Sequence, residues 1–271
     1  MSGNTARTIL ALDRRGDLAF TGSSIRFDTP AIFGGQLLAQ VLFAAGNTLE
    51  SERPASHLHA HFLSFGDPRR KLEFKVRRVK DGRSISVRQV EVVQEERLLM
   101  LATVAFAQSG DGYEFCRPMP DRPRPTALSD DGGIGFSLGT DADAFPFQVG
   151  VCPGTDAGGC NTSSIWVRSL LDAGGSPLWQ QMLFAFISDA TVLQSALGPH
   201  GLAFDTPGLV VATVNHTIWF HRALGLGDWI LIDSECPSTG AGRAVSLAHA
   251  YSEAGELQCT VAQEGVLKGA R

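Results

Sequence analysis

Apolar residues concentrate in two long segments of the chain, about 17–108 and 163–268. Within the first segment, apolar positions at three- and four-residue spacing predict a helix over 32–49. Four runs with strand character follow it, separated by short polar turns. The helical positions are Leu37, Leu38, Val41, Leu42 and Ala45, and the predicted strands span 57–65, 71–81, 82–94 and 98–108.

The second segment repeats this order. A short strand at 165–171 is followed by an apolar helix that we expect to begin at Ser188, with Asp189 in its first turn. Strands are predicted at 209–221, 228–236, 242–252 and 257–267. Short sequence motifs recur as well: "GRSISV" in the first segment resembles "GRAVSL" in the second, and "ATVAF" resembles "CTVAQ". The pattern indicates an internal duplication of one supersecondary unit.

Each half predicts an α+β unit in which a long antiparallel sheet wraps around one apolar helix. We therefore expect an N-terminal unit over 1–108 and a C-terminal unit over 161–271. Residues 109–160 are rich in Pro, Gly and Asp with little periodicity, which is typical of a linker and surface loop.

Composition narrows the class of function. The net charge of −5 and the sequence pI near 5.8 argue against a nucleic-acid surface, which is normally basic. The five cysteines include no Cys-x-x-Cys pair, so we expect a reducing cytoplasm, no disulfide framework and no metal site. The N-terminus has neither signal-peptide nor anchor character, and we expect that no stretch reaches the length of a membrane span.

Asp189 is a carboxylate in an otherwise apolar stretch, and burying it is costly unless it is compensated. Alone it fits a helix N-cap, a role that Ser188 fills equally well. The first half has Gly35 and Gln36 at the corresponding place. At the last strand, Gln263 stands where the first half has Phe106.

Asp189, Gln263 and Thr213, on the strand after the helix, form a set of acid, amide and hydroxyl on three consecutive elements. Such a set suits attack by water on an activated acyl group. The acid accepts a proton from the water, and the other two groups fix its position. We expect backbone N–H groups at the helix N-terminus to stabilise the developing oxyanion.

The chain resembles the acyl-CoA thioesterase II family, whose members are double hotdog folds. The resemblance rests on "FGGQLLAQVLFAA", "HAHFLSFGDP", "KDGRSISVRQVEVVQ", "PHGLAF", "ATVNHTIWFHR" and "TVAQEGVLK", in order across both halves. It implies hydrolysis of acyl-CoA to a fatty acid and CoA without a cofactor. It also implies a catalytic Asp, Thr and Gln that orient water, at Asp189, Thr213 and Gln263.

Substrate contacts are predicted at the start of the first helix and on nearby strands, and one of them, His59, matches a histidine discussed in that family. For His59 we also keep the alternative of a strand histidine packed under the sheet edge. Arginines are the candidates for the CoA phosphates, and aromatic side chains for the acyl tunnel. These candidates are Gly34, Gly35, Gln36, His59, Arg83 and Trp219, with Arg69, Arg70, Phe33, Phe62 and Phe220.

Two other functions stay open at this point. The chain could be an acyl-thioester hydratase or dehydratase, with His59 and Asp67 as candidates, or an acyl-CoA-binding protein of weak activity. We expect acyl-CoA as the partner, no nucleic acid and no membrane. We also expect a homo-oligomer, a dimer or larger, because open sheet edges commonly pair between chains.

Overall fold

The computed structural model describes residues 10–27, 29–108, 110–125, 147–153, 161–172 and 174–269. The described residues fall into two compact units by their contacts. Of the described residues, the first unit contains those up to residue 115 together with 171–186, and the second contains 116–125, those within 147–170, and those from residue 187 onward.

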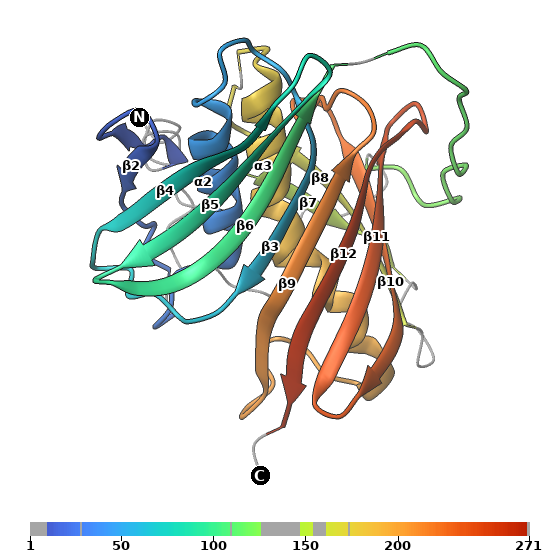
Figure 1. The fold of residues 1–271 in the computed structure, drawn as a ribbon. Coiled ribbons are helices and arrows are strands. Elements are labelled where there is room, and N and C mark those ends of the chain that lie inside the picture. Colours follow the sequence, from blue (N-terminus) through green and yellow to red (C-terminus); the bar gives the residue numbers. More distant parts are fainter. Residues whose placement is uncertain are drawn as a thin grey trace. The chain divides into compact units, whose positions relative to one another are not determined.

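The first unit is an antiparallel sheet with one helix, coloured blue to green in Figure 1. Its strands lie in the order β1-β2-β4-β5-β6-β3. The predicted helix and four long strands are confirmed, and β1 and β2 are additional. The elements are β1 (Asp13–Arg14), β2 (Ala19–Gly22), α2 (Gly34–Gly46), β3 (Ala55–Phe62), β4 (Leu72–Asp81), β5 (Ile85–Gln94) and β6 (Arg97–Ala107).

The second unit repeats the plan with strand order β9-β12-β11-β10-β8-β7. Read from β3 and from β9, the two sheets match strand for strand, and so the predicted duplication is confirmed. The elements are β7 (Phe147–Val151), β8 (Thr162–Ser169), η2 (Val192–Ala196), η3 (Gly198–His200), β9 (Val210–Phe220), β10 (Ile230–Gly240), β11 (Arg243–Ser252) and β12 (Leu257–Lys268).

The helix expected to begin at Ser188 begins eleven residues earlier, and that prediction is wrong. Helix α3 spans Pro177–Thr191, and the 3-10 turn η2 follows it. Pro177 occupies the first helical position, where its missing N–H costs nothing, and Ser176 accepts the Gln180 N–H through its carbonyl. The segment that packs against β8, β10, β11 and β12 is η2, directly after Asp189 and the end of α3.

Helices α2 and the first part of α3 pack closely in the first unit and run antiparallel. The ring of Phe33, before α2, lies 4.9 Å from that of Phe186, while Phe43 near the other end of α2 lies 6.5 Å from Trp179. A Cβ on Gly35 would come within 2.2 Å of the Phe186 carbonyl oxygen. Glycine at this position therefore permits the close approach of the two backbones.

One described stretch, Pro177–His200, is 24 residues long and contains an 18-residue window with a mean hydropathy of 1.2, enough by length and composition to cross a membrane. The expectation that no stretch reaches that length is therefore wrong. Within the protein, 78% of this stretch's apolar window is buried. Such burial is usual for the core helix of a globular fold.

The segment expected to be a linker contains structure. Strand β7 pairs with β8, and residues 116–125 lie against the second sheet. There Arg122 forms an ion pair with Asp233 at 2.9 Å, and the Trp166 indole N–H donates to the Pro123 carbonyl. Residues 126–146 and 154–160 lie outside the described part of the chain.

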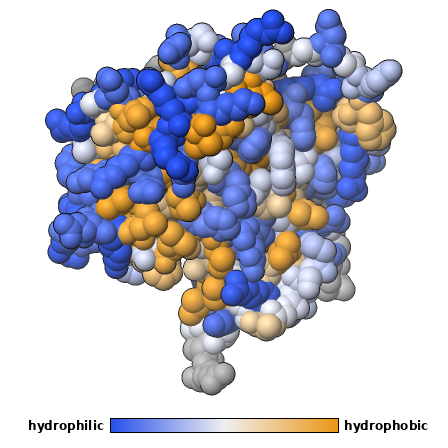
Figure 2. Space-filling view, in the orientation of Figure 1, coloured by the Kyte–Doolittle hydropathy of each residue, from blue (hydrophilic) through white to orange (hydrophobic). Residues whose placement is uncertain are grey.

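The long strands alternate between a buried and an exposed face. On β4, Leu72, Phe74 and Val76 are buried while Glu73, Lys75 and Arg77 are exposed. Polar side chains with scattered apolar patches consequently cover the side of the protein seen in Figure 2. The helical element of each unit meets the opposite, apolar face of its sheet.

Candidate active site

Asp189, Thr213 and Gln263 meet in the second unit and hydrogen-bond one another. The Thr213 hydroxyl donates to Asp189 Oδ1 at 2.9 Å. The Gln263 amide donates to the same oxygen at 2.9 Å and to Thr213 Oγ1 at 2.8 Å. The three side chains come from α3, β9 and β12, which are far apart in the sequence.

The carboxylate and the amide are secluded from solvent, whereas Thr213 is half-buried. The Asp189 side chain is 5% exposed and Gln263 is 1% exposed. A buried carboxylate needs hydrogen-bond donors, and the hydroxyl and the amide provide them. This arrangement answers why an acid interrupts an apolar run.

A β-bulge in β9 brings Thr213 onto the same face as Gln263. Gln263 lies opposite His216 and Gly265 lies opposite Thr213, so Val214 is an extra residue in β9. Without it, Thr213 and His216, three positions apart, would point to opposite faces. Bulges often redirect a side chain beside a site.

His216 completes the surroundings of Asp189. It is fully buried, with Nδ1 3.9 Å from Asp189 Oδ1 and Nε2 3.0 Å from the Ser188 hydroxyl. Burial lowers the pKa of His216 to about 3, although a contact with Gln263 acts in the opposite direction. The imidazole is therefore neutral beside the carboxylate near pH 7.

The helix N-terminus expected beside Asp189 is elsewhere. Asp189 lies in the last turn of α3, and its side chain bonds Thr213 and Gln263, so both the N-cap role and the oxyanion donors from its own helix are ruled out. Among the described residues, no group of three or more His, Cys, Asp or Glu side chains is placed to hold a metal ion.

Comparison with known proteins points to one family. A protein-family model described as acyl-CoA thioesterase matches residues 140–266. A second family model, described as acyl-CoA thioesterase N-terminal domain, matches residues 24–107. The chain belongs to the acyl-CoA thioesterase II family. The family's Acyl-CoA thioesterase 2 from Haemophilus influenzae is 29% identical over 273 residues, covering 96% of each chain.

Solved structures agree with this membership. Acyl-CoA thioesterase II TesB2 from Mycobacterium marinum has a TM-score of 0.85 at 27% identity and covers 98% of both chains. A hot dog fold protein of unknown function from Alicyclobacillus acidocaldarius has a TM-score of 0.80 at 18% identity and covers 97% of this chain and 98% of its own. The predicted α+β double hotdog fold is confirmed.

Three of the predicted substrate contacts lie at the start of α2, in the first unit. Gly34 begins the helix, and Gly35 faces the Phe186 carbonyl. Gln36 is fully buried, accepting the Ile25 N–H at 2.7 Å and donating to the Ser23 carbonyl and to Gln40. Substrate binding by these residues stays a prediction.

The remaining predicted contacts lie on strands or turns. His59, on β3, has its Nε2 3.0 Å from that of His61, and burial, with the neighbouring histidines, lowers the pKa of His59. Arg83 is exposed between β4 and β5. Trp219, in the second unit, is 41% exposed on β9. Their role in binding also stays a prediction.

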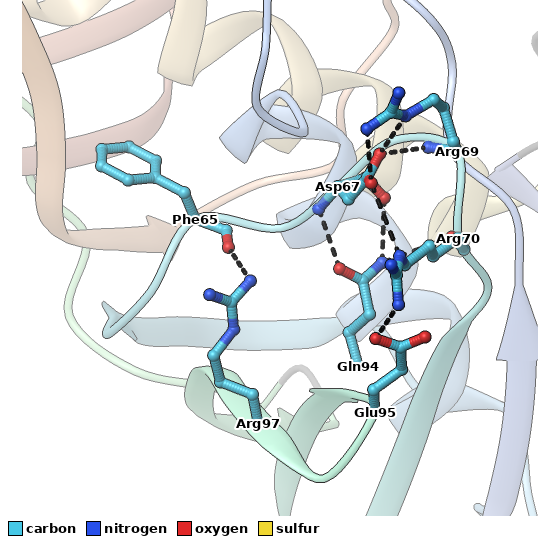
Figure 3. A network of polar contacts seen from close by, with 7 residues as sticks. All are labelled: Phe65, Asp67, Arg69, Arg70, Gln94, Glu95 and Arg97. Carbon is cyan, nitrogen blue, oxygen red and sulfur yellow. Dashed lines mark hydrogen bonds and ion pairs between the residues drawn. The ribbon is translucent and has the colours of Figure 1, made fainter.

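Two of the proposed phosphate-binding arginines belong to a network in the loop between β3 and β4 (Figure 3). Arg69 and Arg70 both pair with Asp67, and Arg70 also pairs with Glu95. The bond from Arg69 holds the pKa of Asp67 at about 2. With two carboxylates beside them, these arginines have less net charge to offer a phosphate.

The sequence alone did not predict that His216 lies beside Asp189. The signal that would have revealed it is the cross-strand register, in which His216 lies opposite Gln263. That register depends on the pairing of β9 with β12, which the alternation of apolar and polar residues along each strand does not reveal.

Proposed function

We propose that the chain hydrolyses acyl-CoA to a free fatty acid and CoA through a water molecule held by Asp189, Thr213 and Gln263. The observation that carries the proposal is the mutual hydrogen bonding of these three groups within 2.9 Å. Membership of the thioesterase family supports the same reaction.

In this mechanism Asp189 acts as general base. It takes one proton from water while the water oxygen bonds to the acyl carbon. The tetrahedral intermediate then collapses, breaking the carbon–sulfur bond. Asp189 returns its proton to the leaving CoA thiolate, and the new carboxylic acid ionises. The thioester needs no enzyme nucleophile because its carbonyl carbon is already electrophilic.

Thr213 and Gln263 would orient the water. Each already bonds Asp189, so an entering water takes over one of these bonds and remains within reach of all three groups. A closed polar triangle that is largely buried holds its geometry before substrate arrives, and such preorganisation is the main source of electrostatic catalysis.

Thiol release from a panel of acyl-CoAs tests the proposal against the two alternatives. Hydrolysis by the unmodified protein that disappears in Asp189→Ala supports the proposal. Binding of acyl-CoA without thiol release would favour a binding protein. Loss of enoyl-CoA absorbance without thiol release would favour a hydratase.

Further expectations accompany this function. We propose a homo-oligomer, since β7 ends the strand order of its sheet and offers an edge for pairing. A reducing cytoplasmic location fits the free thiols of Cys116, Cys152, Cys236 and Cys259. Boundaries between the two units and the linker near residues 108 and 161 also remain a proposal. Light scattering of the purified protein tests the proposed homo-oligomer.

A further inference from the structure

Two buried polar atoms beside the catalytic triangle lack a hydrogen bond of good geometry among the described residues. They are His216 Nδ1 and Gln263 Oε1. The two residues lie directly opposite each other on β9 and β12, which places their side chains on the same face about 4.5–5.5 Å apart at Cβ. Leaving both atoms unpaired is costly, so they are natural partners for each other.

The other nitrogen of His216 indicates which tautomer the ring adopts. Its Nε2 lies 3.0 Å from the Ser188 hydroxyl, and both groups are fully buried. When that hydroxyl donates to Nε2, the ring proton resides on Nδ1. Nδ1–H is then a donor that faces the carboxamide of Gln263.

The orientation of the Gln263 carboxamide decides whether the triangle forms. Its NH2 group donates to Asp189 and to Thr213. A flipped amide would place its carbonyl oxygen against the Asp189 carboxylate, acceptor against acceptor. A donor that bonds Gln263 Oε1, on the other side of the amide, stabilises only the orientation in which the NH2 group donates to both Asp189 and Thr213.

We propose that His216 is a positioning residue for the reaction, in which its Nδ1–H holds Gln263 Oε1 and thereby aims the Gln263 amide at Asp189 and Thr213. The inference rests on the proposed function, since it assigns His216 a task within that catalytic set. His216 touches neither water nor substrate and acts through Gln263.

The neutral ring is required for this task. A protonated His216 would face Asp189 Oδ1 at 3.9 Å and compete for the carboxylate that must accept the proton of water. Burial keeps the pKa of His216 far below neutrality, so the ring serves as a neutral donor throughout the working pH range.

The first test reads the tautomer directly and needs no activity. Nitrogen-15 NMR of the full chain with labelled histidine distinguishes Nδ1–H from Nε2–H rings, with His216→Asn used to assign the signal. We expect His216 to be neutral with its proton on Nδ1. A proton on Nε2 would overturn the inference, whatever the activity of the protein.

The second test uses a matched pair of substitutions. In His216→Asn the amide nitrogen replaces Nδ1 and still donates to Gln263, whereas in His216→Gln the amide replaces Nε2 and reaches only Ser188. We expect His216→Gln to lower kcat roughly 10- to 100-fold with little change in KM, because misplacement of a catalytic group has effects of this size. His216→Asn should retain most of the kcat.

Measuring the effect of His216→Gln in a protein that also carries Gln263→Ala separates a positioning role of His216 from a general structural role. If His216 acts through Gln263, His216→Gln should lower kcat no further once Gln263 is removed. An equal loss in both backgrounds, or an Asn variant as impaired as the Gln variant, would overturn the inference. Full activity of Asp189→Ala would instead refute the proposed function and leave the tautomer result standing.

Discussion

At the residue scale, the candidate site is a set of mostly buried polar groups whose partners come from distant parts of the sequence. Comparing the two halves singled out Asp189 and Gln263, and the structure brings both into contact with Thr213. Their catalytic role stays a prediction. His216 could not be found in this way, because the pairing of β9 with β12 that sets it opposite Gln263 becomes visible only in the structure.

Burial of His216 predicts a pH dependence of stability. The folded protein keeps this ring neutral down to about pH 3, whereas in the unfolded chain it binds a proton below about pH 6.5. Between these values the unfolded state binds more protons, so the free energy of unfolding falls as the pH falls. The contribution approaches about 1.4 kcal/mol per pH unit.

Denaturant unfolding of His216→Asn between pH 7 and pH 4 measures this contribution. The variant should lose stability less steeply than the unmodified protein. His200→Asn, which alters an exposed histidine, is the control and should keep the original slope. Equal slopes for all three proteins would contradict the account.

At the element scale, strands were easier to predict than the second helix. The hairpin between β5 and β6 was visible because a polar turn separates two apolar runs, and Glu95 and Glu96 adopt the positive φ angles that this turn requires. The start of α3 was missed because residues 178–187 are almost wholly apolar or amide, with no charged face to show a helical period.

Close packing of α2 against α3 makes Gly35 sensitive to substitution. The new methyl group of Gly35→Ala would overlap the backbone carbonyl of Phe186, so we expect the free energy of unfolding to fall by about 1–3 kcal/mol. Gly46→Ala is the matched control, since its methyl group meets only the flexible end of Leu178 at 2.9 Å.

Chemical denaturation compares the two alanine variants. Gly46→Ala should change the free energy of unfolding by less than about 1 kcal/mol, because alanine also favours the helix. A Gly35→Ala variant as stable as the Gly46→Ala variant would show that the two helices can separate without cost, contrary to the packing described.

At the scale of the whole molecule, one duplicated plan carries the candidate catalytic set in only one copy. Phe106 lies opposite Ala55 and Ser86, as Gln263 lies opposite His216 and Ser246. The first unit therefore has apolar groups where the second has the amide and the imidazole, and α2 contains no acidic residue. The order of elements revealed the duplication, but the asymmetry of contacts required coordinates.

Restoring one polar group to the first unit should not restore catalysis. In the double variant Asp189→Ala/Phe106→Gln, we expect no more thiol release than in Asp189→Ala alone, since α2 supplies no carboxylate to match Asp189. Thermal melting should accompany the assay because Phe106 is fully buried. Hydrolysis above the level of the single variant would place a second site in the first unit.

The central claim is that the Asp189 carboxylate activates water. The most direct measurement is kcat of Asp189→Asn on an acyl-CoA that the unmodified protein hydrolyses, with thermal melting as the control for folding. We expect kcat to fall about a hundredfold or more at an unchanged melting temperature, because the amide keeps the shape but cannot accept the proton. Turnover close to that of the unmodified protein, or a loss explained entirely by unfolding, would contradict the account.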